Sequence, residues 1–159
     1  VPWLTLAPPS GDGGPATAAH LAAPQDLAVD SVGNLYIVDI NAQVRKVNTA
    51  TGIITTLFTV SPTAGHSGEP IAIDDSGNIY LGKPTHHRIY KFTSSGAQST
   101  FAGSSPLPTG TMPNGTPGFS GDNGLATAAR LSWPYDIVVK NGFMYIVDSG
   151  NNRIRKVRF

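Results

Sequence analysis

The sequence of 159 residues contains no cysteine. It therefore excludes disulfide bonds, zinc sites built on thiolates and catalytic thiols, and it is compatible with any redox compartment. Long apolar runs are also missing. Because a membrane-spanning helix needs roughly 18 such residues, we expect no membrane insertion.

Charge is scarce as well. Charged residues make up 13% of the chain and the net charge is +1, against about 25% charged residues in an average domain. Such a chain has no overall field to attract nucleic acid, so we expect no nucleic-acid partner. Sequence motifs of serine hydrolases, phosphate-binding loops and zinc proteases are absent, which argues against an enzyme.

Turn-forming residues are abundant, with 18 glycines and 13 prolines, and they separate three similar units. Each unit contains a turn glycine followed by apolar and aromatic residues: Gly33–Asp39, Gly77–Lys83 and Gly142–Asp148. Short β-prone runs precede and follow each of these strands. One all-β region over residues 1–159 is expected, with repeat units at about 24–58, 68–103 and 134–159.

A fourth strand is expected in the first two units only, at Ile53–Phe58 and Ala97–Gly103. The third unit has none after Ile154–Val157. The chain instead opens with the strand-like segment Trp3–Ala7, which precedes Gly11 as Ser99–Gly103 precedes the region of Gly121. The repeat is therefore staggered by one strand.

One segment of twenty residues occurs twice, at Gly11–Asp30 and Gly121–Lys140, with 11 identities. Its glycines and alanines predict a turn and a short helix that lead into a strand. The alternative is that Asp12 and Asp122 bind a cation or a substrate. The middle unit lacks this segment, and Lys83 stands there in place of Asp39 and Asp148.

These motifs closely resemble NHL-repeat β-propellers, especially bacterial ones, over essentially the whole chain. The resemblance implies four-stranded blades, usually six in a ring. Three blades would leave two apolar faces in water. We therefore expect half of a six-bladed ring, a homodimer in which Trp3–Ala7 of one chain completes the third blade of the other. The alternative is a fragment whose partners are neighbouring blades of a longer propeller.

We interpret the basic residues near the C-terminal end as regular residues of a strand, and not as part of an RNA-binding surface. Lys46, Lys91 and Lys156 share one repeat position, and Arg45, Tyr90 and Arg155 share the next. Their charged groups are expected to reach water, or to pair with Asp39 and Asp148. His86 and His87 align with Asn151 and Asn152 and are expected to be turn residues.

Loops that enter the first strand of each blade surround the channel of a propeller, and channel mouths favour pockets. The candidate ligand-binding residues there are Asp26, Glu69, Trp133, Tyr135, Asp136 and His66. The carboxylates could hold a cation, although Asp26 and Asp136 could equally accept backbone hydrogen bonds at the strand starts. No cofactor is expected, and the presence of a metal is left open.

The sequence thus predicts a non-catalytic binding or assembly module, secreted or at the cell surface. Its ligand, a protein, a glycan or a small molecule, would bind at the loop face or in the channel. The alternative is a metal-assisted lactonase-like hydrolase or lyase with its site at the hub of the propeller. That reading requires histidine and carboxylate ligands that converge on the axis.

Overall fold

A computed structural model describes residues 9–40, 43–60, 69–93, 95–104 and 117–159. The chain divides into two compact units, Val1–Ser67 and Gly68–Phe159. The predicted strand Trp3–Ala7 and the candidate residue His66 lie outside the described residues.

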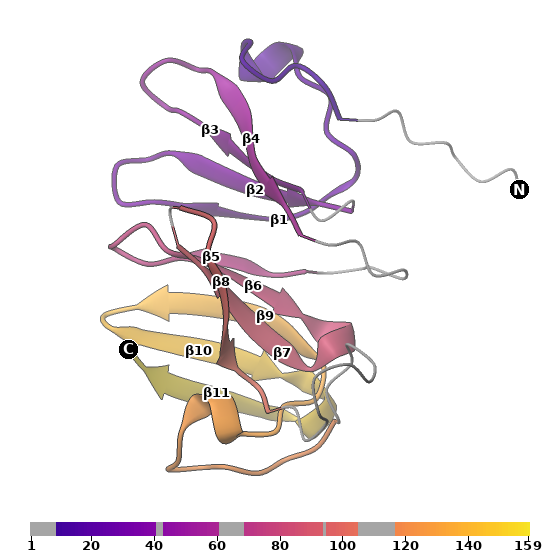
Figure 1. Ribbon diagram of the computed structural model, residues 1–159, viewed down its shortest axis with the longest axis vertical. Coiled ribbons are helices and arrows are strands. Elements are labelled where there is room, and N and C mark those ends of the chain that lie inside the picture. Colours follow the sequence, from indigo (N-terminus) through magenta and orange to yellow (C-terminus); the bar gives the residue numbers. More distant parts are fainter. Residues whose placement is uncertain (1–8, 41–42, 61–68, 94, 105–116) are drawn as a thin grey trace, which may run out of the picture. The chain divides into compact units, whose positions relative to one another are not determined.

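The first unit contains one antiparallel sheet with the strand order β1-β2-β3-β4 (Figure 1). The strands are β1 (Pro24–Val29), β2 (Leu35–Asp39), β3 (Gln43–Val47) and β4 (Ile54–Thr59). A short 3-10 helix, η1 (Ala16–Ala18), precedes them. Each strand pairs with its neighbour in the sequence, as expected for strands joined by short turns.

The second unit contains two antiparallel sheets. The first has the order β5-β6-β7-β8, with β5 (Ile71–Ile73), β6 (Ile79–Lys83), β7 (Arg88–Phe92), β8 (Gln98–Ala102) and the 3-10 helix η2 (Pro84–His86). The other has the order β11-β10-β9, with β9 (Pro134–Lys140), β10 (Phe143–Asp148) and β11 (Arg153–Arg158). Two further 3-10 helices are η3 (Ala126–Ala128) and η4 (Ser149–Asn151).

The same aspartate turn joins the first two strands of the first two sheets. Asp74 Oδ1 accepts hydrogen bonds from the backbone of Ser76 and Asn78, and Oδ2 accepts from Asn78 Nδ2 and Tyr80 Oη. Asp30 makes the equivalent set of contacts in the first sheet. Gly77 adopts φ +79°, which favours glycine at this turn. The carboxylates of this motif therefore fix the turn.

The two sheets of the second unit pack face to face. Ala72, Tyr80 and Ile89 from β5, β6 and β7 form one buried cluster with Ile137, Met144 and Ile146 of the β9–β11 sheet and with Leu131, which lies in the loop before β9. Phe101 contributes an edge-on contact to the ring of Tyr80, with 5.0 Å between the ring centroids. This is one complete sheet-to-sheet interface within the chain.

The all-β fold predicted from the sequence is confirmed. The expected short helix of the doubled segment is present as η1 and η3, and His86 and His87 form a turn after β6, with His87 in the left-handed conformation. Among the described residues, the third sheet has three strands and the others four. The described part contains no helix long and apolar enough to span a membrane.

Candidate functional site

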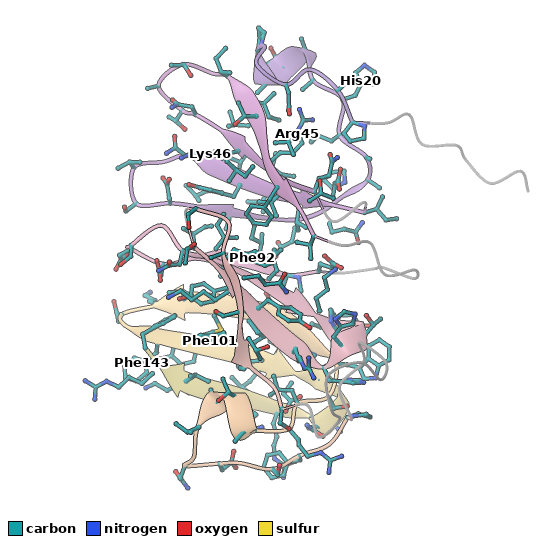
Figure 2. The ribbon with its side chains drawn as sticks, viewed as in Figure 1. His20, Arg45, Lys46, Phe92, Phe101 and Phe143 are labelled. Carbon is teal, nitrogen blue, oxygen red and sulfur yellow. The ribbon has the colours of Figure 1, made fainter. Side chains whose placement is uncertain are left out.

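In the first unit, an arginine fastens the doubled segment to the sheet. Arg45 extends from β3 and is almost completely buried. Its Nη1 donates to the carbonyl of His20 at 2.9 Å, and its Nη2 donates to the carbonyl of Ser10 at 3.1 Å and to Asp12 Oδ1 at 2.5 Å. Figure 2 labels Arg45 and His20 in the first unit. We call this set of contacts an arginine clasp.

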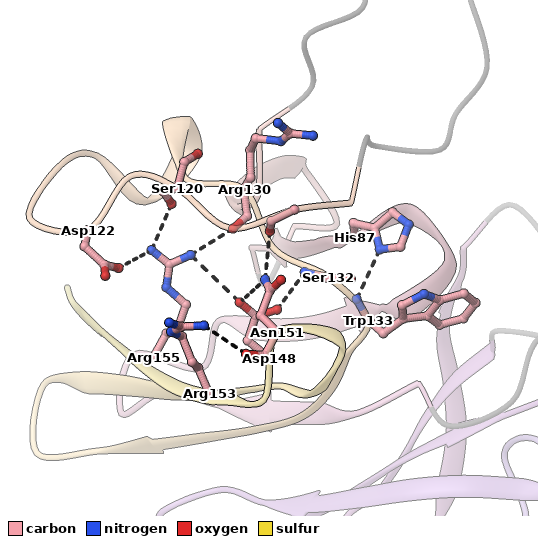
Figure 3. Close-up of polar contacts among 11 residues, drawn as sticks. His87, Ser120, Asp122, Arg130, Ser132, Trp133, Asp148, Asn151, Arg153 and Arg155 are labelled. Atoms are coloured by element: carbon pink, nitrogen blue, oxygen red, sulfur yellow. Dashed lines mark hydrogen bonds and ion pairs between the residues drawn. The ribbon is translucent and has the colours of Figure 1, made fainter.

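The second copy of the segment is held by an equivalent clasp. Arg155 on β11 donates to Asp122 Oδ1 at 2.6 Å and to the carbonyls of Arg130 at 2.9 Å and Ser120 at 3.0 Å (Figure 3). Its Nη1 also lies 3.9 Å from Asp148 Oδ2. Asp12 in the first copy and Asp122 in the second each form an ion pair with an arginine of the sheet. These contacts indicate a structural role for the doubled segment.

The clasps correct one sequence-based expectation. The guanidinium groups of Arg45 and Arg155 do not extend into water, because loop carbonyls and carboxylates surround them. The expected pairing with an aspartate of the preceding strand does occur between Arg155 and Asp148. A signal was available in the sequence: the arginine occurs only in the units that carry the loop, and the middle unit has Tyr90 instead.

Asp12 also binds the backbone of the fourth strand. Its Oδ2 accepts a hydrogen bond from the Thr56 N–H at 2.9 Å. Burial raises the pKa of Asp12, but the hydrogen bonds from Thr56 and Arg45 outweigh this effect and lower the pKa below its ordinary value. One carboxylate thereby links the loop, β3 and β4.

At the start of β9, two aromatic rings form an exposed pair. Trp133 and Tyr135 stack with 6.1 Å between ring centroids and an angle of 15° between planes, and both are partly open to solvent. Trp133 has φ +51°, which is unfavourable for a bulky residue. The backbone N–H of Trp133 donates to His87 Nδ1 at 3.1 Å, and the side-chain rings of the two residues meet edge to face (Figure 3).

His87 supports this loop as a neutral acceptor. Burial lowers its pKa, and the nearby charge of Asp148 opposes that effect without cancelling it. In a neutral imidazole, Nδ1 can accept the hydrogen bond from the backbone N–H of Trp133. A protonated ring carries a hydrogen on Nδ1 and could not accept it. The neutral ring of His87 therefore favours the observed contact with the Trp133 backbone.

The middle sheet carries a buried ion pair where the third sheet has an aspartate. In the third sheet, Asp148 accepts from the Ser132 N–H at 2.6 Å and from Asn151 Nδ2 at 2.8 Å. In the middle sheet, Lys83 Nζ donates to Glu69 Oε1 at 2.7 Å, and both side chains are buried. Lys83 occupies the repeat position of Asp148, and Glu69 supplies the negative charge that pairs with this lysine.

The structure brings together only part of the predicted site. Trp133 and Tyr135 are in contact, whereas the carboxylate of Glu69 is buried against Lys83. Asp136 and Asp26 each accept a hydrogen bond at 2.8 Å from the backbone N–H of the next residue. This is the alternative that the sequence left open, in which both carboxylates bind the backbone at a strand start. No group of three His, Asp or Glu side chains that could hold a metal is found in the described part.

The sheets define the class of protein. Antiparallel meanders of successive strands, four-stranded in the first two sheets, are typical of the blades of a β-propeller, and the two sheets of the second unit stack face to face as such blades do. The family model of the teneurin NHL domain matches residues 7–66 and 59–158. The chain belongs to this family, which confirms the NHL-repeat resemblance.

Two relatives in the family are human teneurin-4, 33% identical over 87% of this chain, and mouse teneurin-1, 30% identical over 89%. The chain spans 6% of the length of each. Because these relatives are animal proteins, the bacterial type expected from the sequence is not confirmed.

Solved structures show the same fold at low identity. A catalytically inactive virginiamycin B lyase from Staphylococcus aureus with quinupristin has a TM-score of 0.52 and 17% identity, over 84% of this chain and 37% of that one. A streptogramin B lyase has a TM-score of 0.50 and 18% identity, over 86% and 52%. At such identities the likeness concerns the fold alone.

Proposed function

We propose that this chain is a non-catalytic assembly module whose partner is a second copy of itself. The three blades, at about 24–58, 68–103 and 134–159, would form half of a six-bladed propeller. The observation that carries this proposal is that the two halves of the sheet-to-sheet interface inside the second unit recur as exposed apolar faces.

The open face of the third sheet consists of Val138, Tyr145 and Ile154. Tyr145 lies opposite Val138 across β9 and β10, as Tyr80 lies opposite Ala72 in the middle sheet. Tyr145 is 38% exposed and Ile154 is 66% exposed. Their counterparts Tyr80 and Ile89 are completely buried by the next sheet.

The open face of the first sheet consists of Leu21, Leu27 and Val29. Leu27 occupies the repeat position of Ile137, and Leu21 that of Leu131. Ile137 is 3% exposed in its interface, whereas Leu27 is 58% exposed. This face matches the surface that the third sheet presents to the middle one.

A second copy can cover both open faces at once. If the open face of the third sheet in one copy packs on that of the first sheet in the other, a two-fold axis generates the reciprocal contact. Each copy then buries two apolar faces, a favourable term proportional to the area removed from water. Two copies of three blades give the usual closed ring.

We also propose a ligand at the loop end of the third blade. The exposed Trp133–Tyr135 pair offers two parallel ring faces, which suit a sugar ring, a peptide side chain or a planar small molecule. No cofactor is part of this proposal, although a cation could join at the channel. A module of low charge that binds in this way suits a secreted or cell-surface location.

Light scattering on a sizing column tests the assembly. We expect a mass of two chains of 16.6 kDa. Replacing Val138 with glutamate would bury an uncompensated carboxylate in the contact and weaken dimerisation about a hundredfold, equivalent to about 3 kcal/mol. Val32→Glu, at an exposed turn valine of the first unit, is the matched control and should leave the mass unchanged.

A monomer at all accessible concentrations would contradict the proposal, as would equal effects of Val138→Glu and Val32→Glu. The ligand site has its own test: quenching of Trp133 fluorescence by added oligosaccharides and peptides, in a Trp3→Phe background. Loss of any such response in Tyr135→Ala, with the mass unchanged, would support the aromatic pair as the site.

A further inference from the structure

The strand β8 forms one edge of the middle sheet (Figure 1), and the first half of this edge is open to solvent. Residues 96–99 are exposed. In the first sheet, the equivalent strand β4 has its edge covered by the loop that contains Gly13 and Gly14. The two sheets therefore present the same kind of edge, once covered and once uncovered.

Main-chain hydrogen bonds attach the loop to β4 in the first sheet. Gly13 N–H donates to the Ile54 carbonyl at 2.8 Å, and Ile54 N–H donates to the Gly14 carbonyl at 3.1 Å. Ala16 N–H donates to the Gly52 carbonyl at 2.8 Å. The loop runs antiparallel to β4. The edge of this sheet thus accepts an extended antiparallel segment.

The register identifies the groups that β8 presents at its own edge. Ile54 of β4 and Gln98 of β8 each lie opposite the last residue of the preceding strand. In both turns, the N–H of the residue after that strand donates to the carbonyl just before Ile54 or Gln98, at 2.9 and 3.0 Å. Because bonded and non-bonded pairs alternate in an antiparallel ladder, the N–H and C=O of Gln98 point outward, as those of Ile54 do. The Thr100 N–H and the Gly96 carbonyl complete the outward row.

This row has no covering segment among the described residues. Within those ranges, no backbone hydrogen bond joins another segment to Gln98 or Thr100, and the loop before β9 reaches only Gly103 and Ser104, beyond the end of β8. Natural proteins usually protect an edge with lysine, proline or a covering segment. Residues 96–101 read Gly-Ala-Gln-Ser-Thr-Phe, without a charged residue or a proline. The β8 edge therefore lacks these protections.

We propose that the β8 edge binds an extended segment of a partner protein, which adds to the middle sheet as an antiparallel strand. The loop on β4 supplies the pattern of contacts: the Gln98 N–H donates to the partner, and the carbonyls of Gln98 and Gly96 accept from it. In β-strand addition, such main-chain bonds provide the affinity. The proposal is independent of the two-copy assembly, whose contacts lie on the faces of the sheets.

The surroundings of the edge favour a segment without charge. On β4, Asp12 accepts from the Thr56 N–H and forms an ion pair with Arg45. In the middle sheet, Tyr90 takes the place of that arginine. A carboxylate of the partner at this point would have no guanidinium to neutralise it. The partner segment therefore carries a neutral acceptor, an amide side chain or a backbone carbonyl, for the Thr100 N–H.

The probe is a phage-displayed library of ten-residue peptides without charged residues, selected on the full chain. Selected peptides are synthesised and measured against the wild type, Gln98→Pro and Gln98→Ala by fluorescence polarisation. Proline removes the outward N–H and leaves the bonds between β7 and β8, since this N–H points away from β7. We expect Gln98→Pro to weaken binding about tenfold and Gln98→Ala to preserve it, because alanine keeps the main-chain donor.

Amide hydrogen exchange of the wild type gives a second measurement that requires no variant. At a peptide concentration ten times the Kd, exchange at Gln98 and Thr100 should slow about tenfold, because the bound form protects both N–H groups. This result, together with the difference between Gln98→Pro and Gln98→Ala, supports the proposal. It holds even if Gln98→Pro fails to fold.

Four outcomes would overturn the proposal. The library yields no binder, or the selected peptides bind Gln98→Pro as well as the wild type and leave exchange at Gln98 unchanged. In the third, Tyr135→Ala abolishes binding and Gln98→Pro does not, which assigns the peptides to the aromatic pair. In the fourth, Gln98→Pro lowers the mass of an assembly larger than two chains, which makes the occupant the β8 edge of another copy.

Discussion

The guanidinium of Arg155 is held 2.6 Å from the carboxylate of Asp122, and the same contact joins Arg45 to Asp12 at 2.5 Å. In both cases 33 residues separate the partners, and the arginine also binds two carbonyls of the loop. The clasp therefore belongs to the repeat, in those units that carry the loop.

Removal of a clasp should destabilise the fold. Arg155→Met removes one donor from each of the carbonyls of Ser120 and Arg130 and removes the ion pair with Asp122, although the Ser120 carbonyl keeps the backbone N–H of Arg130. We therefore expect the free energy of unfolding to fall by about 1–3 kcal/mol. Urea denaturation measures the change. Arg158→Met, an exposed site on the same strand, should change it by less than about 0.5 kcal/mol; equal losses would contradict a specific role for the clasp.

The Lys83–Glu69 pair should show strong coupling. Lys83→Met alone removes the ammonium group 2.7 Å from the buried carboxylate of Glu69 and should cost about 3–5 kcal/mol. Adding Glu69→Gln removes that charge, so the double variant should recover a large part of the loss. A double-mutant cycle measured by urea denaturation checks this. Additive effects of the two substitutions would show that the ion pair contributes no coupling.

Acid should weaken the first two sheets through their turn aspartates. Burial raises the pKa of Asp74, but hydrogen bonds from Asn78, Tyr80 and Ser76 outweigh it and lower the pKa overall. The folded state therefore binds the proton less well than the unfolded chain, whose aspartate pKa is about 3.9. The stabilisation is present above that value and is lost as the pH falls through the lower pKa of the folded state.

Asp74→Asn should thus reduce the loss of unfolding free energy between about pH 6 and about pH 3, as measured by urea denaturation. Asp75→Asn, at the exposed neighbouring residue, is the control for the removal of one carboxylate from the same turn. A steeper acid loss in Asp74→Asn than in the wild type would contradict the assignment.

Protonation of His87 should disturb the aromatic pair. Because burial lowers its pKa, the folded state prefers the neutral ring. The stability that this group provides is complete above the ordinary histidine value of about 6.5 and declines as the pH falls below it. In a Trp3→Phe background, Trp133 fluorescence should report the transition, with a midpoint below about 6.5.

His87→Asn is the informative variant, because the equivalent position in the third sheet is Asn152, which has the same left-handed conformation. Asparagine does not titrate in this range, so the fluorescence transition should disappear. If the transition persists in His87→Asn, another group must cause it.

The sequence predicted the repeat, the strands of the described residues and the all-β fold, because turn residues and β-prone runs are local signals, whereas the predicted strand Trp3–Ala7 lies outside the described residues. It also predicted turn roles for His86 and His87 from their alignment with Asn151 and Asn152. Each of these features can be predicted from the residue type at a single position of the repeat.

Interactions between distant positions were harder to predict. The partner of Lys83 is Glu69, which periodicity alone suggested as a ligand-facing carboxylate, and only the packed sheet shows that the two charges neutralise each other. The left-handed Trp133 has no local signal, since a bulky residue rarely adopts φ +51°. The equivalent residue of the first copy, Ala23, is also left-handed with φ +43°, so the conformation belongs to the repeated segment, and the contact with His87, 46 residues away, is added to it.

The strand order has a consequence for folding. Within the described residues, every strand pairs only with strands adjacent to it in the sequence. Such a chain has low contact order for an all-β protein, so each sheet can form rapidly from its own continuous stretch, Pro24–Thr59, Ile71–Ala102 or Pro134–Arg158. During synthesis, the first sheet can fold before the third has left the ribosome.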